Sequence, residues 1–250
     1  MAGGVGAQSF VVAPESTAGF IAQPPSVTTF AAFGTGRPLW PSDITGLVLW
    51  LPADQIQGIA SGTSLSNWTD SSASASHATQ PSAVSQPVFL TNIQNSLSAI
   101  SFGTGLAQLM QSPTTLLNTF TLALAGSVYT TRTQAFISAS AGAISPKITA
   151  STTYFAVNGI ALPGSATTVG QFVSLIAIFN PSATTFSVSG TTTFGDAGAT
   201  TNATLTNIGA VAVSSQTLSG YIGEVVVYNR NLSEIQRSQL ESYLRTKWAI

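Results

Sequence analysis

Apolar and polar positions along most of this chain follow the pattern of short strands separated by turns. In the segment TFTLALAGSV, Phe120, Leu122 and Leu124 alternate with Thr and Ala, which is the two-residue period of a half-buried strand. The segment at 171–179 is apolar almost throughout, and we expect a strand buried on both faces there. Gly, Pro, Asn and Ser separate these segments, as they do in turns. The pattern predicts strands at 46–51, 98–102, 119–128, 134–140, 153–159, 171–179, 184–190, 208–213 and 221–228.

One segment, 233–248, has the period of an amphipathic helix instead. Ser233 and Gln236 match a capping box at its start, and Arg245 and Lys247 suit the negative end of the helix dipole. An apolar stripe recurs with helical spacing and is expected to lie on the sheets. The stripe consists of Leu240, Tyr243, Leu244 and Trp248.

The first forty residues show neither the strand period nor the helix period. Gly, Ala and Pro are frequent there, so we expect an extended N-terminal arm at 1–40 and a single domain at 41–250. The widely spaced aromatic side chains of the arm resemble anchors that enter pockets of a partner or of the chain's own domain, whereas the alternative is a flexible leader. The predicted assembly contacts are Phe10, Phe20, Phe30 and Phe33.

Many short strands with turn residues between them predict an all-β fold. The expected architecture is an antiparallel jelly-roll β-sandwich with a short C-terminal helix at 233–248 and the extended N-terminal arm.

Composition limits the possible partners. Only 6% of residues are charged, against about 25% in an average protein. Because 44% are hydrophobic and the net charge is −1, the chain can bury a core, and its surface must consist mainly of uncharged polar and small residues. The scattered Lys and Arg favour neither nucleic acid nor an anionic membrane surface. No apolar run is long enough to span a bilayer, and the first residues do not resemble a secretory signal.

Several motifs resemble the laminin-G-like, concanavalin A-like jelly-roll domains. They are GLVLWLPADQIQG at 46–58, NWTDSS at 67–72, QPVF at 86–89, AISFG at 99–103, YFAVNG at 154–159 and the closing GYIGEVVVYNRNLSEIQRSQLESYLRTKWAI at 220–250. The match covers about 46–250, and its last segment is the specific one. The resemblance implies packing roles for the aromatic residues and bracing roles for Asp70 and Glu224. The aromatic residues concerned are Trp50, Trp68, Tyr243 and Trp248.

The supply of catalytic groups is small. Glucanase relatives of this fold carry paired acids as E-x-D-x-x-E on one strand, and no such cluster occurs here. The only histidine, His77, lies among serines and forms no recognisable triad. Asp54, Asp70 and Asp196 are too dispersed to indicate a calcium site, and the chain has no cysteine. We therefore expect no catalytic, cofactor-binding or metal-binding residues, and no enzyme.

The resemblance implies two classes of function. Such domains occur in bacteriophage structural proteins, so the first expectation is a homo-oligomeric virion protein, most specifically a capsid decoration (cement) protein. It would be assembled in the host cytoplasm and would contact shell or tail proteins and copies of itself. The alternative is a carbohydrate-binding or adhesive lectin-like module, in a tail fibre or secreted. The loop LSNWTDSS at 65–72 has a composition suited to sugar binding, with Trp68 and Asp70 as the predicted glycan contacts.

Overall fold

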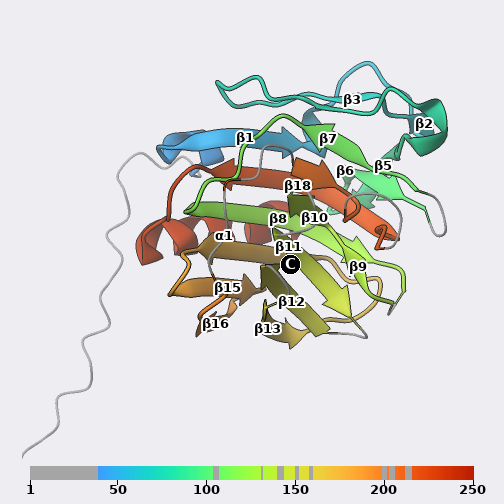
Figure 1. Ribbon diagram of the computed structural model, residues 1–250. Coiled ribbons are helices and arrows are strands. Elements are labelled where there is room, and N and C mark those ends of the chain that lie inside the picture. Colours follow the sequence, from blue (N-terminus) through green and yellow to red (C-terminus); the bar gives the residue numbers. More distant parts are fainter. Residues whose placement is uncertain are drawn as a thin grey trace, which may run out of the picture. The chain divides into compact units, whose positions relative to one another are not determined.

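The computed structural model describes residues 39–103, 107–130, 132–139, 144–149, 152–157, 160–198, 202, 206–211 and 216–250. The expected all-β architecture is confirmed: strands in antiparallel sheets make up most of the described fold, with one α-helix near the C-terminus (Figure 1). The predicted contacts Phe10, Phe20, Phe30 and Phe33 lie outside the described residues, as does nearly all of the predicted arm.

The largest sheet has nine strands among the described residues. Its order is β16-β15-β14-β8-β18-β6-β5-β2, and β1 pairs with the C-terminal half of β18. Every pairing in it is antiparallel. The strands are β1 (Leu47–Pro52), β2 (Thr63–Ser64), β5 (Val88–Gln94), β6 (Leu97–Phe102), β8 (Phe120–Val128), β14 (Val173–Phe179), β15 (Thr184–Val188), β16 (Thr191–Gly195) and β18 (Gly220–Tyr228).

Two smaller sheets form the opposing layer. One has the order β10-β17-β7-β4-β3 and the other β13-β12-β11-β9. Their strands are β3 (Asn67–Trp68), β4 (Ala78–Thr79), β7 (Met110–Ser112), β9 (Gln134–Ala135), β10 (Ile137–Ala139), β11 (Ile144–Thr149), β12 (Thr152–Val157), β13 (Ile160–Ala166) and β17 (Thr206–Ile208). Within the described residues, three short 3-10 helices lie in the connections: η1 (Pro41–Asp43), η2 (Ala53–Gln55) and η3 (Ala83–Ser85).

The main core lies between these layers. Side chains from the nine-stranded sheet, such as Phe120 and Val225, belong to one buried cluster with Trp68, Met110 and Ile208 from the five-stranded sheet. This arrangement is a β-sandwich, in which the inner faces of two layers exclude water from one shared core.

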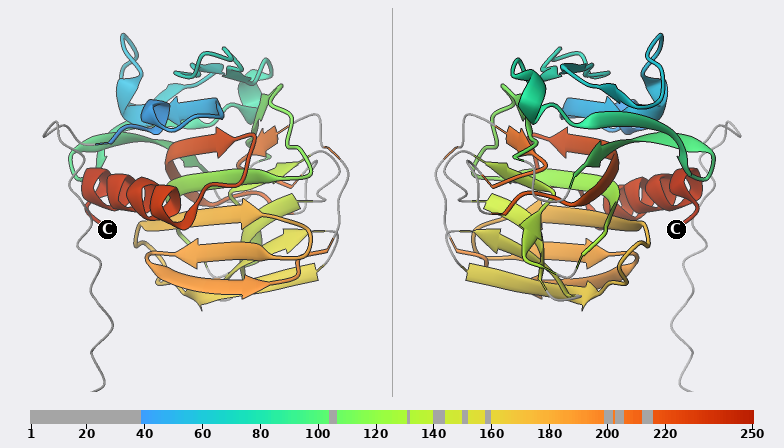
Figure 2. Two further views of the ribbon diagram at one scale, coloured as in Figure 1. Left: turned by 90° about the vertical axis from the view of Figure 1, so that its left-hand side faces the viewer. Right: turned by 90° about the vertical axis from the view of Figure 1, so that its right-hand side faces the viewer.

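A second core lies on the outer face of the nine-stranded sheet, under α1 (Glu234–Trp248) (Figure 2). The predicted capping box is present: the Ser233 hydroxyl accepts a hydrogen bond from the Gln236 backbone N–H, and the Gln236 side-chain oxygen accepts one from the Ser233 backbone N–H. Leu240, Leu244 and Trp248 are buried against the sheet, as the helical stripe predicts.

Several local predictions need correction. The strand expected at 208–213 is β17, at Thr206–Ile208, and the one expected at 134–140 divides into β9 and β10, which join different sheets. Strand β8 is buried on both faces rather than half-buried, because α1 covers the face that carries Ala123 and Ala125. Small side chains there let the helix approach closely. The segment 191–195, where the pattern predicts no strand, forms strand β16, which continues the large sheet beyond β15.

Candidate functional site

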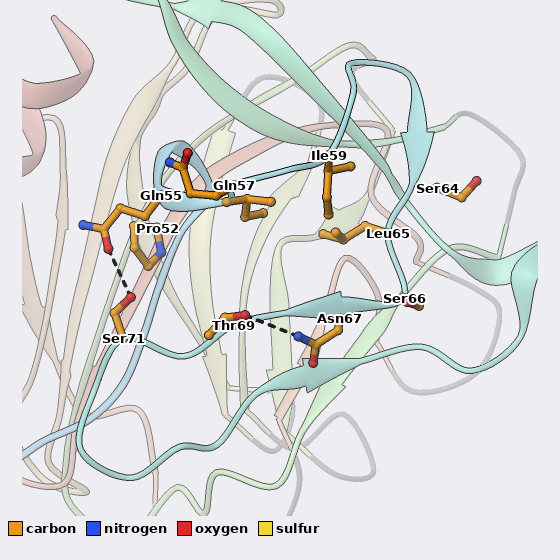
Figure 3. Close-up of a pocket in the computed structure, with 11 residues that line it drawn as sticks. Pro52, Gln55, Gln57, Ile59, Ser64, Leu65, Ser66, Asn67, Thr69 and Ser71 are labelled. Carbon is orange, nitrogen blue, oxygen red and sulfur yellow. Dashed lines mark hydrogen bonds between the residues drawn. The ribbon is translucent and has the colours of Figure 1, made fainter.

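A shallow depression opens where β1 and η2 meet the loops around β2 and β3. Its volume is about 440 Å³ (Figure 3). The rim consists of amide and hydroxyl side chains, and the floor consists of aliphatic groups. No charged side chain lines it. The lining residues are Pro52, Gln55, Ile56, Gln57, Ile59, Ser64, Leu65, Ser66, Asn67, Thr69 and Ser71.

Two hydrogen bonds order polar groups of this rim. Asn67 donates from its amide to the Thr69 hydroxyl at 3.3 Å, and Ser71 donates to the Gln55 side-chain oxygen at 3.2 Å (Figure 3). Asn67, Thr69 and Gln55 are all exposed, so their remaining donors and acceptors face solvent. The depression therefore offers an array of uncharged hydrogen-bonding groups beside an aliphatic surface.

Asp70 holds the loop beside this depression against strand β1. Its carboxylate accepts hydrogen bonds from the backbone N–H groups of Trp50, Ser72 and Ser76, each at 2.8 Å, and from the Ser72 hydroxyl at 2.7 Å. The Asp70 backbone N–H donates to Nδ1 of His77 at 3.0 Å. These hydrogen bonds give Asp70 the bracing role that the resemblance implies. His77 contributes to the same loop as the acceptor of the Asp70 backbone N–H.

The two predicted glycan contacts are not presented to solvent. Trp68 has no accessible surface and belongs to the main core, so neither face of its indole is available for stacking on a sugar. Asp70 is 5% exposed, and both of its oxygens already accept hydrogen bonds.

A second polar cluster surrounds Glu224, which is fully buried on β18. Its Oε1 accepts hydrogen bonds from Nε1 of Trp50 at 2.6 Å and from the Tyr243 hydroxyl at 2.7 Å. Its Oε2 accepts one from Nε1 of Trp248 at 3.0 Å and lies 2.9 Å from Nζ of Lys247. Burial, together with the nearby Glu224 carboxylate, raises the pKa of the Tyr243 phenol far above its ordinary value.

The same lysine reaches Asp54 in η2. Nζ of Lys247 lies 2.8 Å from Oδ1 of Asp54, so one amine joins two carboxylates that are far apart in the sequence. Asp54 and Lys247 also line a second cavity, of about 500 Å³, whose walls are mainly apolar. Trp40 lies in the wall of that cavity, with its ring centroid 5.8 Å from that of Trp50 and 6.1 Å from that of Tyr243.

The described residues contain no cluster of three or more His, Cys, Asp or Glu side chains that could hold a metal ion. Within the same residues, no helix is both long and apolar enough to cross a membrane.

The sequence matches no protein-family model and no curated protein. Solved structures with a similar fold include the binding domain of Paraclostridial mosquitocidal protein 1, with a TM-score of 0.60 and 11% identity over 83% of this chain and 53% of that one. The botulinum neurotoxin type G receptor binding domain has a TM-score of 0.56 and 10% identity, covering 81% and 52%. Trypanosoma rangeli sialidase in complex with sialic acid has a TM-score of 0.51 and 13% identity, covering 84% and 35%.

These neighbours are jelly-roll-like β-sandwich domains, and the likeness at such low identity shows the fold alone. The chain spans between about a third and about a half of the length of these structures.

Proposed function

We propose that the protein is a non-catalytic recognition module that binds an uncharged glycan in the depression between η2 and β3. The observation that carries the proposal is the lining: exposed amides and hydroxyls of Gln55, Asn67 and Thr69 stand beside an aliphatic floor, without a charged side chain. Sugars present hydroxyl groups that both donate and accept, together with apolar C–H faces, and this combination of groups complements them.

The solved structures with similar folds support a recognition role. Two of them are described as a binding domain and a receptor binding domain, and a third holds sialic acid. Sialic acid carries a carboxylate, whereas the depression has no positive side chain to pair with one. This difference favours a neutral sugar for the present chain.

The placement of the acidic residues supports the absence of catalysis. Glycosidases of the two-carboxylate kind need both acids to face one bond in an open site. Asp54 and Glu224 approach each other through Lys247, but Glu224 is fully buried and both its oxygens accept hydrogen bonds. Glu234 and Glu241 both pair with Arg237.

The test is a glycan array with the purified full-length chain, followed by calorimetry on the ligand found. Asn67→Ala removes a rim amide and is expected to weaken binding about tenfold, because a buried sugar hydroxyl loses its partner. Asn118→Ala removes an exposed amide outside the depression and serves as the matched control. Absence of any neutral glycan ligand, or equal affinity of both variants, would overturn the proposal.

A second candidate function is structural: a bacteriophage capsid decoration protein, with a tail component as the variant. The observation that favours it is the charge content of 6%, because surfaces without ions can pack on neighbouring proteins without a large desolvation cost. In this candidate function Phe10, Phe20, Phe30 and Phe33 contact shell proteins or copies of the chain.

Two measurements test the structural candidate. Immunogold labelling with an antibody to the chain should mark intact virus particles from its source. Mass photometry of the full chain should show a homo-oligomer, which the variant with all four Phe→Ala substitutions weakens. Unlabelled particles together with a monomer at micromolar concentration would exclude a decoration role, whichever result the glycan array gives.

A further inference from the structure

We propose that Lys247 and Asp54 form an intramolecular isopeptide bond, with Glu224 carrying the proton. The cross-link would join η2, directly after the first strand of the large sheet, to the last turn of α1. Nζ of Lys247 lies 2.8 Å from Oδ1 of Asp54 and 2.9 Å from Oε2 of Glu224. The carboxyl carbon that the amine would attack is bonded to Oδ1, so the ion pair holds the two reactants next to each other.

The contact between the amine and Asp54 is a short ion pair made at a buried oxygen. Oδ1 of Asp54 is buried and accepts no hydrogen bond from the described part of the chain, although Nζ is 2.8 Å away. The hydrogen bond that Lys247 does donate goes to the Tyr243 hydroxyl, at 3.3 Å. The amine is thus held against the buried oxygen of the Asp54 carboxyl group.

Glu224 is placed to act as the proton carrier. It has no accessible surface, while the side chains of Lys247 and Asp54 are 14% and 21% exposed. Its carboxylate oxygens accept hydrogen bonds from the two indole N–H groups and from the Tyr243 hydroxyl, so both oxygens have donors without Lys247. Its Oε2 is nevertheless within reach of a proton on Nζ, as a general base must be.

The surroundings exclude water from Glu224 and place aromatic rings around the amine, while Lys247 and Asp54 stay partly exposed at the wall of the second cavity. Nζ of Lys247 lies 5.6 Å from the centroid of the Tyr243 ring and 5.7 Å from that of the Trp248 ring. Trp40 and Trp50 complete the aromatic enclosure beside Tyr243. A buried ion pair keeps a large desolvation cost, and condensation to a neutral amide removes both charges.

The step balances without an oxidant or any other reactant. The ammonium group of Lys247 gives one proton to Glu224, and the free amine adds to the carboxyl carbon of Asp54 to form the C–N bond. One C–O bond of Asp54 then breaks. The departing oxygen takes the proton held by Glu224 and the second proton of the amine, and it leaves as water. Glu224 returns to its starting state.

Intact-mass spectrometry of the purified full-length chain tests the proposal. The expected mass is lower than the sequence mass by one water, about 18 Da, and peptide mapping should show residue 54 joined to residue 247. Lys247→Arg keeps the positive charge but lacks the amine, so this variant should have its full sequence mass. Glu224→Gln should slow or abolish the loss of water.

Three outcomes would overturn the cross-link. A wild-type chain with its full sequence mass means that the three groups form an ion-paired cluster only. The proposal also fails if Lys247→Arg still loses water, or if the cross-linked peptide does not contain both residues. Either result would show that the reaction occurs at other residues. If Glu224→Gln fails to fold, two variants of Asp54 still test the cross-link. Asp54→Ala cannot react and should keep its full sequence mass, whereas Asp54→Asn should lose ammonia instead of water.

Discussion

At the residue scale, the buried carboxylates act mainly as acceptors that hold separate segments together. Asp70 receives four hydrogen bonds from the strand and loop around it. Glu224 receives three and contacts a lysine. In a chain with eight acidic residues, these two are at positions where a backbone or indole N–H would otherwise be buried without an acceptor.

Asp70→Ala should lower the free energy of unfolding by about 3 kcal/mol or more, because several buried donors lose a charged acceptor together. Asp196→Ala is the matched control. Asp196 is exposed and accepts from the Gly198 backbone N–H, so its loss should cost less than about 1 kcal/mol. Urea unfolding followed by tryptophan fluorescence measures both. Equal effects would show that Asp70 does not brace the loop.

Tyr243 should make stability depend on alkaline pH. Its pKa is raised in the folded state, so the stabilisation is fully present below the unfolded pKa of about 10 and is lost as pH rises above that value. Tyr243→Phe cannot ionise and should show a smaller decrease of the unfolding midpoint above about pH 10. The measurement is thermal unfolding from neutral to alkaline pH. Identical profiles for the two proteins would contradict it.

Residue-level prediction from sequence succeeded where the signal is local and failed where it depends on distant residues. The resemblance implied a packing role for Trp68, and its burial in the main core fits that role. Its local composition indicated an exposed loop instead, because its burial is set by strands supplied much later in the chain. The approach of Asp54, Glu224 and Lys247 likewise has no sequence signature, because nearly two hundred residues separate the first from the last.

At the element scale, the C-terminal helix is the part that sequence specifies best. Its capping box, its charges and its apolar stripe are all within one segment, so local rules suffice. Strand β8 shows the opposite case. Its alternation predicts one exposed face, whereas α1 covers that face, and no pattern within the strand reveals the covering helix.

The helix cap can be tested directly. Ser233→Ala leaves the backbone N–H of Gln236 without its side-chain acceptor and should cost about 1 kcal/mol. Ser238→Ala, within the same helix, removes a hydroxyl that caps nothing and should have little effect. Chemical denaturation of both variants distinguishes them. A cost at Ser238 as large as at Ser233 would show that the cap is not the cause.

The contact between β18 and α1 depends on a glycine. A Cβ at Gly223 would lie 2.3 Å from the Trp248 ring, which stacks on Phe172 and cannot easily move. Gly223→Ala should therefore destabilise the fold by about 3 kcal/mol. Gly195→Ala meets only the flexible end of Leu162 and should cost less than about 1 kcal/mol. Melting temperatures that fall equally would contradict this account of the packing.

At the scale of the whole molecule, near-neutrality is the dominant property. A net charge of −1 with 6% charged residues leaves the surface dependent on hydrogen bonds and apolar contacts for recognition. The fold class follows from the many short strands, and it was predictable for that reason. The layer that each strand joins was not predictable, because β-sheet pairing is made between segments far apart in the chain.

Binding to the proposed glycan should be almost independent of salt. Because no charged side chain lines the depression, the dissociation constant should change less than about twofold between roughly 0.05 and 0.5 M sodium chloride. Calorimetry at both concentrations measures it. A large loss of affinity at high salt would indicate a charged ligand and a different site.

The position of β18 has a consequence for the order in which the protein can fold during translation. This strand lies between β8 on one side and β6 and β1 on the other, yet the ribosome makes it after every other strand of the sheet. Until residues 220–228 have emerged from the exit tunnel, β1, β6 and β8 have no common neighbour, and their apolar edges remain open. The large sheet therefore cannot be completed segment by segment, and its central pairings form only after β18 has been made.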